Sequence, residues 1–166
     1  MNRRSLCSAV LVSASCLFSA GSLAHHSLAS FDVSAPLWIK GAVVRFERVN
    51  PHSLIFLDET MPDGQVRRWA VYGPSTVQLE RKGLDQEFLQ AGEVIEVCGF
   101  ALKDGVAAQQ TLPKADGAAP SGPSLTGQVI QGTVLVTPDG KKRVWSDYGS
   151  GLQKCVSPED QGALVR

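Results

Sequence analysis

Three histidines are the residues of this chain best suited to chemistry, and they fall into two short motifs. His25 and His26 form the pair in an Ala-His-His-Ser motif, and His52 ends an Asn-Pro-His motif. Imidazole nitrogens are ligands of copper, zinc and nickel, and ligation by nitrogen alone favours copper(II), with zinc and nickel behind it. The histidines therefore predict a metal site, with copper as the most suitable ion.

The histidine pair directly follows a segment with the three parts of a secretory signal peptide. Arg3 and Arg4 give a positive start, residues 6–18 are apolar and uncharged, and small residues precede a cleavage position after Ala24. The apolar run is too short to span a bilayer as a retained helix. We expect residues 1–24 to be a signal peptide and the mature protein to be periplasmic or secreted.

Cleavage after Ala24 would make His25 the first residue of the mature protein. Its α-amine and ring Nδ1 can then close one six-membered chelate ring on a metal ion, and His52 can supply a third nitrogen. In a second geometry, the amine, the next amide nitrogen and the ring of His26 bind copper(II) in a plane. Both geometries need neutral nitrogens, so affinity should fall below about pH 6.5. The sequence does not choose between them.

A purely structural role for these histidines is the alternative. The pair can be a polar start of the chain, and the ring of His52 can satisfy backbone groups at its turn. Met61, in the next turn, is either a soft axial ligand or an ordinary loop residue. These alternatives stay open from sequence alone.

Composition limits the class of protein. Residues 25–166 have the length of one domain. Removing Arg3 and Arg4 turns the balance of 16 basic and 16 acidic residues into a small negative charge, without a basic stripe. Nucleic acid is therefore not an expected partner, nor is a membrane after cleavage. An uncleaved anchor and a lipoprotein cleaved at Cys16 are the alternatives to a soluble mature chain.

Two cysteines, Cys98 and Cys155, would remain after cleavage. Thiols in an oxidising compartment usually pair, so we expect a disulfide. The bridge would close a loop of about 57 residues and contribute about 4 kcal/mol in the chain-entropy model. Two free ligand cysteines are the alternative, although their spacing matches no zinc motif.

Residues 25–112 read as a β core that begins with an extended lead-in. Gly41 suggests a bend in the first strand, and Ser75 suits the N-cap of a short helix that Gly83 interrupts. Predicted strands cover residues 37–49, 53–58, 66–72, 93–102 and 106–112.

Residues 113–124 are rich in Pro, Gly and Ala and predict a flexible insertion. Residues 125–166 predict a C-terminal β-hairpin, turned at Asp139-Gly140, and a polar tail tied down by Cys155. Three strands, a short helix and further strands are the order of a mainly β, small OB-like Greek-key β-barrel, with a β-sandwich as the alternative. Such a fold assigns no function by itself.

The sequence resembles an uncharacterised family of small exported bacterial proteins, a domain of unknown function. The resemblance covers most of residues 24–112, and Pro138-Asp139-Gly140 is similar to the family's closing segment. It implies a periplasmic or secreted single-domain β protein without a known activity. The matching residues are the Ala-His-His-Ser start with Phe31-Asp32 after it, Gly41-Ala42-Val43-Val44, Asn50-Pro51-His52, Trp69, a Leu84-containing segment before Ala91-Gly92-Glu93, Gly99-Phe100 and Lys103-Asp104-Gly105.

Some features depart from the family pattern. Ser53-Leu54 follows the Asn-Pro-His motif where an aromatic residue often stands, and Cys98, Cys155 and the 113–124 insertion are additional. The departures leave the histidines intact. They weaken the hypothesis of a ligand pocket shared with the family more than the hypothesis of a shared metal site.

The leading hypothesis is an exported metal-binding β-barrel protein, most suitably for copper, that acts as a carrier or buffer rather than a catalyst. Its partners would be the metal ion and an envelope protein. The alternative is a periplasmic binding module without metal, for a small ligand or a partner protein, in which tryptophans matter more than histidines. Trp38, Trp69 and Trp145 are expected in the core, or as a stacking platform in that alternative. An oxidative copper enzyme is the third possibility.

Overall fold

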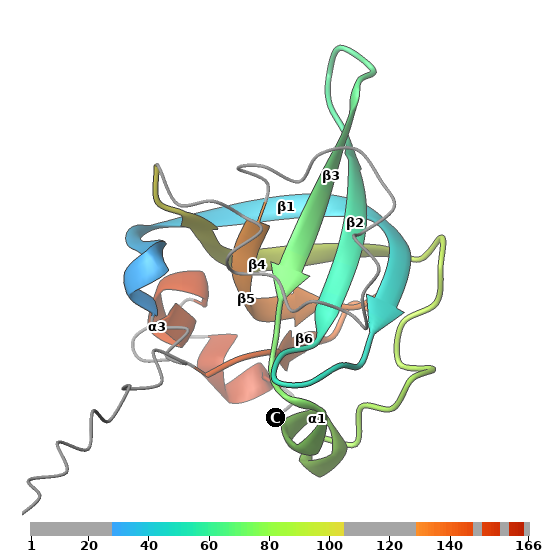
Figure 1. Ribbon diagram of the computed structural model, residues 1–166, viewed down its shortest axis with the longest axis vertical. Coiled ribbons are helices and arrows are strands. Elements are labelled where there is room, and N and C mark those ends of the chain that lie inside the picture. Colours follow the sequence, from blue (N-terminus) through green and yellow to red (C-terminus); the bar gives the residue numbers. More distant parts are fainter. Residues whose placement is uncertain (1–27, 105–128, 148–150, 157–159, 165–166) are drawn as a thin grey trace, which may run out of the picture.

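The computed structural model describes residues 28–104, 129–147, 151–156 and 160–164, and within them one six-stranded sheet dominates (Figure 1). The mainly β class predicted from sequence is confirmed. The strands are β1 (Phe31–Glu47), β2 (Leu54–Thr60), β3 (Val66–Tyr72), β4 (Val94–Leu102), β5 (Val129–Val136) and β6 (Lys142–Val144). The helices are α1 (Thr76–Arg81) and α3 (Gly151–Cys155), with 3-10 turns η1 (Leu28–Ser30) and η2 (Asp160–Ala163).

The strand pairings run in a ring. The order in the sheet is β3-β2-β1-β4-β5-β6, with all of these neighbours antiparallel. In addition, β3 pairs in parallel with β5 through Ala70–Tyr72 and Val129–Gln131. The pairing therefore returns from β3 through β5 and β4 to β1, with β6 added at an edge. All described strands belong to this one sheet, so the two sheets of a β-sandwich are not observed in the described part.

β1 is shared between two partners. Its first half pairs with β4 and its second half with β2, with an irregular register between Val43 and Arg45. A Cβ on Gly41 would lie 2.7 Å from the Asp58 carbonyl oxygen, so glycine permits the close approach of β2. The strand begins at Phe31 rather than 37, because Phe31 pairs with Leu102 and its side chain is buried.

Both faces of β2 are buried, which explains its run of apolar residues. Successive side chains of a strand point to opposite faces. Ile55 and Leu57 therefore enter one apolar cluster, together with Trp145, while Leu54 and Phe56 enter a second one. The second cluster includes residues of α3.

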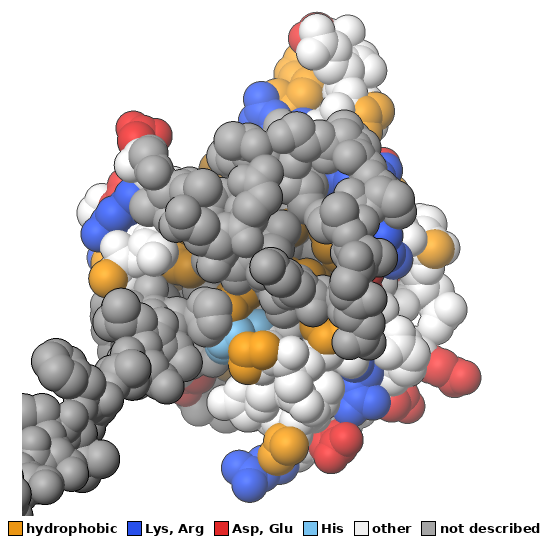
Figure 2. Space-filling view, viewed as in Figure 1, with side chains coloured by type: hydrophobic (Ala, Val, Ile, Leu, Met, Phe, Trp, Pro, Cys, Tyr) orange, Lys and Arg blue, Asp and Glu red, His pale blue; other side chains and the backbone are white. Residues whose placement is uncertain are grey.

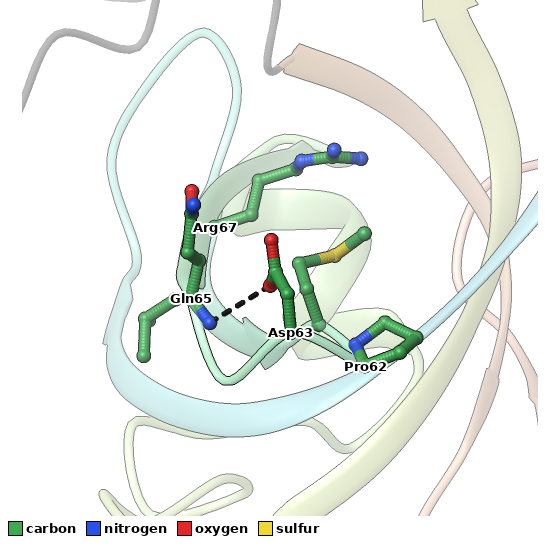
Figure 3. A pocket seen from close by; sticks show the side chains of 6 residues that line it. Pro62, Asp63, Gln65 and Arg67 are labelled. Atoms are coloured by element: carbon green, nitrogen blue, oxygen red, sulfur yellow. Dashed lines mark hydrogen bonds between the residues drawn. The ribbon is translucent and has the colours of Figure 1, made fainter.

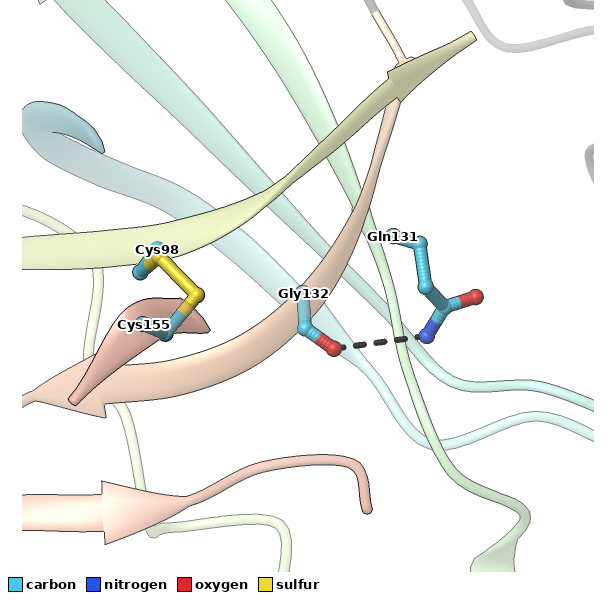
Figure 4. Close-up of a disulfide and its surroundings, with 4 residues drawn as sticks. All are labelled: Cys98, Gln131, Gly132 and Cys155. Carbon is cyan, nitrogen blue, oxygen red and sulfur yellow. Dashed lines mark hydrogen bonds between the residues drawn. A yellow bond between two sulfur atoms is a disulfide. The ribbon is translucent and has the colours of Figure 1, made fainter. Parts of the chain in front are cut away.

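The disulfide Cys98–Cys155 joins α3 to β4, as the sequence led us to expect (Figure 4). Both cysteines are buried, and Leu152 of α3 packs in the same cluster. The tail was predicted to be polar and held by Cys155 alone. Instead a short helix forms there, because its apolar residues pack in a buried cluster against β1, β4 and β5.

The short helix after Ser75 is confirmed as α1. The Ser75 side chain accepts a hydrogen bond from the Gln78 amide, and the Gln78 side chain accepts one from the Ser75 amide. Gly83 follows with a φ of 68°, which ends the helical segment. No helix in the described part of the chain is long and apolar enough to cross a membrane.

Several predictions fall on residues outside those described. They are the signal peptide at 1–24, His25 and His26, the strand at 106–112 and the flexible insertion at 113–124. The hairpin within 125–166 is present as β5 and β6, and β5 is also an integral strand of the main sheet.

Candidate functional site

His52 lies in the loop between β1 and β2, and neighbouring segments hold this loop on both sides. Asn50 Oδ1 accepts hydrogen bonds from the amide and hydroxyl of Thr76 (3.2 and 2.9 Å) at the start of α1. The amide and hydroxyl of Ser53 donate to the Pro74 carbonyl (2.9 and 2.7 Å). The loop is thereby fixed against the connection from β3 to α1, and His52 is fixed with it.

The ring of His52 has a defined tautomer. Its Nδ1 lies 3.1 Å from the carbonyl oxygen of Gly73. A carbonyl oxygen only accepts, so Nδ1 must carry the hydrogen, and in the neutral ring the lone pair is then on Nε2. Metal-bound histidines usually donate their second ring nitrogen to a carbonyl or carboxylate in this manner. His52 is therefore held in the tautomer suited to a ligand that binds through Nε2.

Aromatic ring contacts through Tyr72 link His52 to Phe31, the first residue of β1. The rings of His52 and Tyr72 have centroids 4.3 Å apart, and the ring of Phe31 lies 6.3 Å from that of Tyr72. The described chain begins at Leu28, three residues after His25. Three extended residues span about 10 Å. The aromatic contacts place the start of β1, which follows this segment, close to His52.

The side chain of His52 is half-buried. Figure 2 shows the pale blue surface of a histidine beside hydrophobic side chains, and His52 is the one histidine among the described residues.

The structure does not bring other ligand types to His52. Met61 lies beyond the far end of β2, nine residues away, which is roughly 30 Å of extended chain. Figure 1 shows the turn from β2 to β3 and helix α1 at opposite ends of the molecule. Met61 is therefore no axial ligand to an ion at His52. Both Cys98 and Cys155 are in the disulfide, which removes the alternative of free cysteine ligands.

Within the residues that the structure describes, no group of three or more His, Cys, Asp or Glu side chains could hold a metal ion. This part of the chain offers one nitrogen ligand. The other predicted ligands, His25 and His26, lie outside it.

Two surface hollows lie away from His52. One, of about 490 Å³, is at the turn from β2 to β3, where Asp63 accepts a hydrogen bond from the Gln65 amide (3.0 Å; Figure 3). The other, of about 650 Å³, lies between the start of β1 and the end of β4. There, hydrogen bonds from the hydroxyl and amide of Ser34 hold the pKa of the Asp32 carboxyl below its usual range.

The three tryptophans differ in burial. Trp69 and Trp145 are buried, as expected, and Trp69 donates to Glu59 (2.7 Å). Trp38 was expected in the core as well, but 45% of its surface is exposed on β1. It is the tryptophan available to a ligand.

Sequence reasoning missed Tyr72 and Gly73 as the residues that hold His52. The stretch Gly73-Pro74 lies between the strand predicted over residues 66–72 and the predicted N-cap at Ser75, and no contact with His52 was expected of it. Its one usable signal was a glycine and a proline directly after a buried strand, which also occurs at ordinary turns.

Comparison with known families gives a match over residues 11–111 to a family of unknown function, DUF6152. None of the curated proteins and none of the solved structures matches the chain.

Proposed function

This chain belongs to DUF6152, a family of unknown function, and we propose from its own residues that it is an exported copper carrier or buffer. The mature terminus at His25 gives an amine and an imidazole nitrogen, and His52 gives a third nitrogen through Nε2. His26 provides the alternative planar chelate. Nitrogen-only ligation favours copper(II) among the metals such a set binds.

The orientation of His52 is the observation that carries this proposal. Its bond from Nδ1 to the Gly73 carbonyl selects the tautomer with the lone pair on Nε2. The contacts from Phe31 through Tyr72 to His52 support it further, because they place the start of β1 close to this ring.

The disulfide supports an exported protein. The Cys98–Cys155 bridge suits an oxidising compartment such as the periplasm or the exterior of the cell.

Titration of the mature chain, beginning at His25, with copper(II) tests the proposal. We expect one tightly bound ion and an electron paramagnetic resonance spectrum of nitrogen ligation. His52→Ala should weaken binding by at least the 10- to 100-fold that loss of a ligand's supporting partner costs. One extra glycine before His25 should remove the amine chelate while leaving the fold unchanged.

His26→Ala separates the two geometries. If His25 and His52 form the site, this variant binds as the original protein does. If the planar chelate forms instead, His26→Ala abolishes tight binding and His52→Ala has no effect. A mature chain without a tight one-to-one complex rejects the metal function, and parallel titrations with zinc and nickel test the choice of ion.

The exposure of Trp38 favours a second candidate, a periplasmic binding module without metal for a small ligand or partner protein. An exposed tryptophan offers a flat apolar surface with one donor. Under this alternative, Trp38→Ala reduces capture of an envelope ligand while His52→Ala does not. Trp69→Ala is unsuitable for the test, because Trp69 is buried and its loss would destabilise the fold.

A further inference from the structure

The peptide groups around Gly73 are held by residues distant in sequence, and this determines where the Gly73 carbonyl points. The carbonyl oxygen of Tyr72 accepts hydrogen bonds from Trp145 Nε1 (3.3 Å) and Gln131 Nε2 (3.4 Å). The amide of Gly73 belongs to the same peptide plane and donates to the Ser53 carbonyl (2.9 Å). This plane is therefore bonded at both its oxygen and its hydrogen.

Trp145 also packs directly against Gly73. A Cβ placed on Gly73 would lie 2.5 Å from Cζ2 and 2.6 Å from Nε1 of the indole, closer than real side-chain contacts allow. Trp145 is fully buried and lies just after β6, with its own amide bonded to the Thr133 carbonyl (2.8 Å). The indole thus occupies the space that a side chain at position 73 would need.

The Pro74–Ser75 peptide plane, on the other side of the Gly73–Pro74 peptide, is held as well. The Pro74 carbonyl accepts from the amide and hydroxyl of Ser53, the residue that directly follows His52. The Gly73–Pro74 peptide, which carries the Gly73 carbonyl, therefore lies between two hydrogen-bonded peptide planes, and His52 Nδ1 lies 3.1 Å from its oxygen.

We propose that Trp145 is a positioning residue for His52: through the Tyr72–Gly73 peptide it fixes the carbonyl that holds the His52 ring in the tautomer with hydrogen on Nδ1. The use of this tautomer for a metal ion rests on the proposed function, but the positioning does not. Trp145 acts from the C-terminal hairpin on a loop that precedes it by more than ninety residues.

The tautomer of His52 can be measured without metal. Long-range proton–nitrogen spectra of 15N-labelled metal-free protein distinguish a protonated Nδ1 from a protonated Nε2. Trp145→Phe keeps an aromatic ring beside Phe46 and Phe88 but removes the Nε1 donor. Gly73→Ala displaces the indole. We expect both variants to change His52 from a single Nδ1–H form to a mixture of tautomers.

Gln131→Leu removes the second donor to the Tyr72 carbonyl and keeps the indole, so the His52 signals of this variant show how much the Gln131 bond adds to that of Trp145. Ile95→Ala is the control for lost stability. Ile95 is buried and pairs with Gly41, at the level of Asp58 rather than at the His52 end of β2. It should destabilise the protein while the His52 nitrogen signals stay as they are.

Unchanged His52 nitrogen signals in folded Trp145→Phe, or in Gly73→Ala if Trp145→Phe does not fold, would overturn the positioning role of Trp145, as would an equal change in Ile95→Ala. Copper titration of the same proteins separates this inference from the proposed function. A shifted tautomer in variants of a protein that binds no copper supports the positioning and rejects the metal site. Tight copper binding by a protein whose His52 tautomer does not change in the variants supports the metal site and rejects the positioning role. If both hold, Trp145→Phe should weaken copper about 10- to 100-fold.

Discussion

Single glycines determine where two backbones approach each other in this protein. At Gly41, β1 passes so near β2 that a Cβ would lie 2.7 Å from the Asp58 carbonyl oxygen and 3.0 Å from its carbon. These are backbone atoms within a paired strand, so they cannot move aside as the end of a flexible side chain would. Any side chain at this position must therefore distort the pairing of β1 with β2.

Gly41→Ala should consequently destabilise the fold by about 1–3 kcal/mol, the usual cost of forcing extra atoms into a packed site. Urea unfolding monitored by circular dichroism measures the difference. Gly162→Ala is the matched control, because a Cβ there meets nothing within 4 Å. Equal midpoints for Gly41→Ala and Gly162→Ala would contradict the close approach.

Asp139 makes the turn between β5 and β6 sensitive to acid. Hydrogen bonds from the Lys141 side chain, the Thr137 hydroxyl and the Lys141 amide hold the pKa of the Asp139 carboxyl well below its ordinary value. A carboxyl with a lowered folded pKa stabilises above its unfolded pKa and loses this contribution as the pH falls through the folded one.

The stability advantage of the wild type over Asp139→Asn should therefore be constant above about pH 4 and shrink as the pH is lowered further. Denaturant midpoints of both proteins at several pH values measure it. Because the carboxyl is exposed, high salt should reduce the advantage at neutral pH. A difference that grows towards low pH would contradict the assigned hydrogen bonds.

His52 illustrates what the sequence reveals about a single residue. The structural alternative predicted that its ring would bond to the backbone at the turn, and it bonds to Gly73. A ligand histidine needs the same bond, so one observation agrees with both interpretations. The partner is 21 residues away and is a carbonyl, which every residue carries, so no residue type in the sequence could indicate it.

At the level of elements, local signals predicted most of the strands and α1. The strand at 66–72 has the predicted bounds, and the Ser75 cap begins α1 as expected. The helix α3 was missed, because five residues are too few for a periodic pattern. Its stability comes from contacts with β1, β4 and β5 and from the disulfide, all of them distant in sequence.

Replacement of Cys98 and Cys155 by serine together should lower the free energy of unfolding by about 4 kcal/mol, since 57 positions separate the two residues. Thermal unfolding of the oxidised protein and of the double variant measures this. A reducing agent should lower the midpoint of the wild type and leave that of the variant unchanged. If the wild type unfolds at the same temperature with and without reductant, the disulfide does not contribute to the stability of the fold, and the prediction is wrong.

At the scale of the whole molecule, β5 is the strand that links β3 to β4 in the sheet. It pairs with β4 along most of its length and with β3 at its start, and seven of its eight residues are buried. The sequence predicted this strand and the hairpin with β6, but it did not predict the parallel pairing with β3. That pairing joins residues about 60 positions apart, and no local pattern specifies such a partner.

A chain that ends at residue 128 should therefore not fold, although it retains the predicted core of 25–112. Without β5, the strands β3 and β4 lose a common partner and Ile55, Val71 and Val97 lose buried neighbours. Circular dichroism and proton spectra of the truncated chain test this. A chain that ends at residue 147 is the control. It lacks the disulfide but keeps the full sheet, so it should fold with reduced stability.

The bonds at the Tyr72 carbonyl have a consequence for the order of events during synthesis. Of its two donors, Gln131 lies in β5 and Trp145 directly after β6, whereas His52 and Gly73 belong to the first half of the chain. A nascent chain that has emerged only as far as β4 contains the imidazole but not the groups that orient it. Newly made protein should thus acquire a correctly presented His52 only on completion, after its C-terminal hairpin has closed.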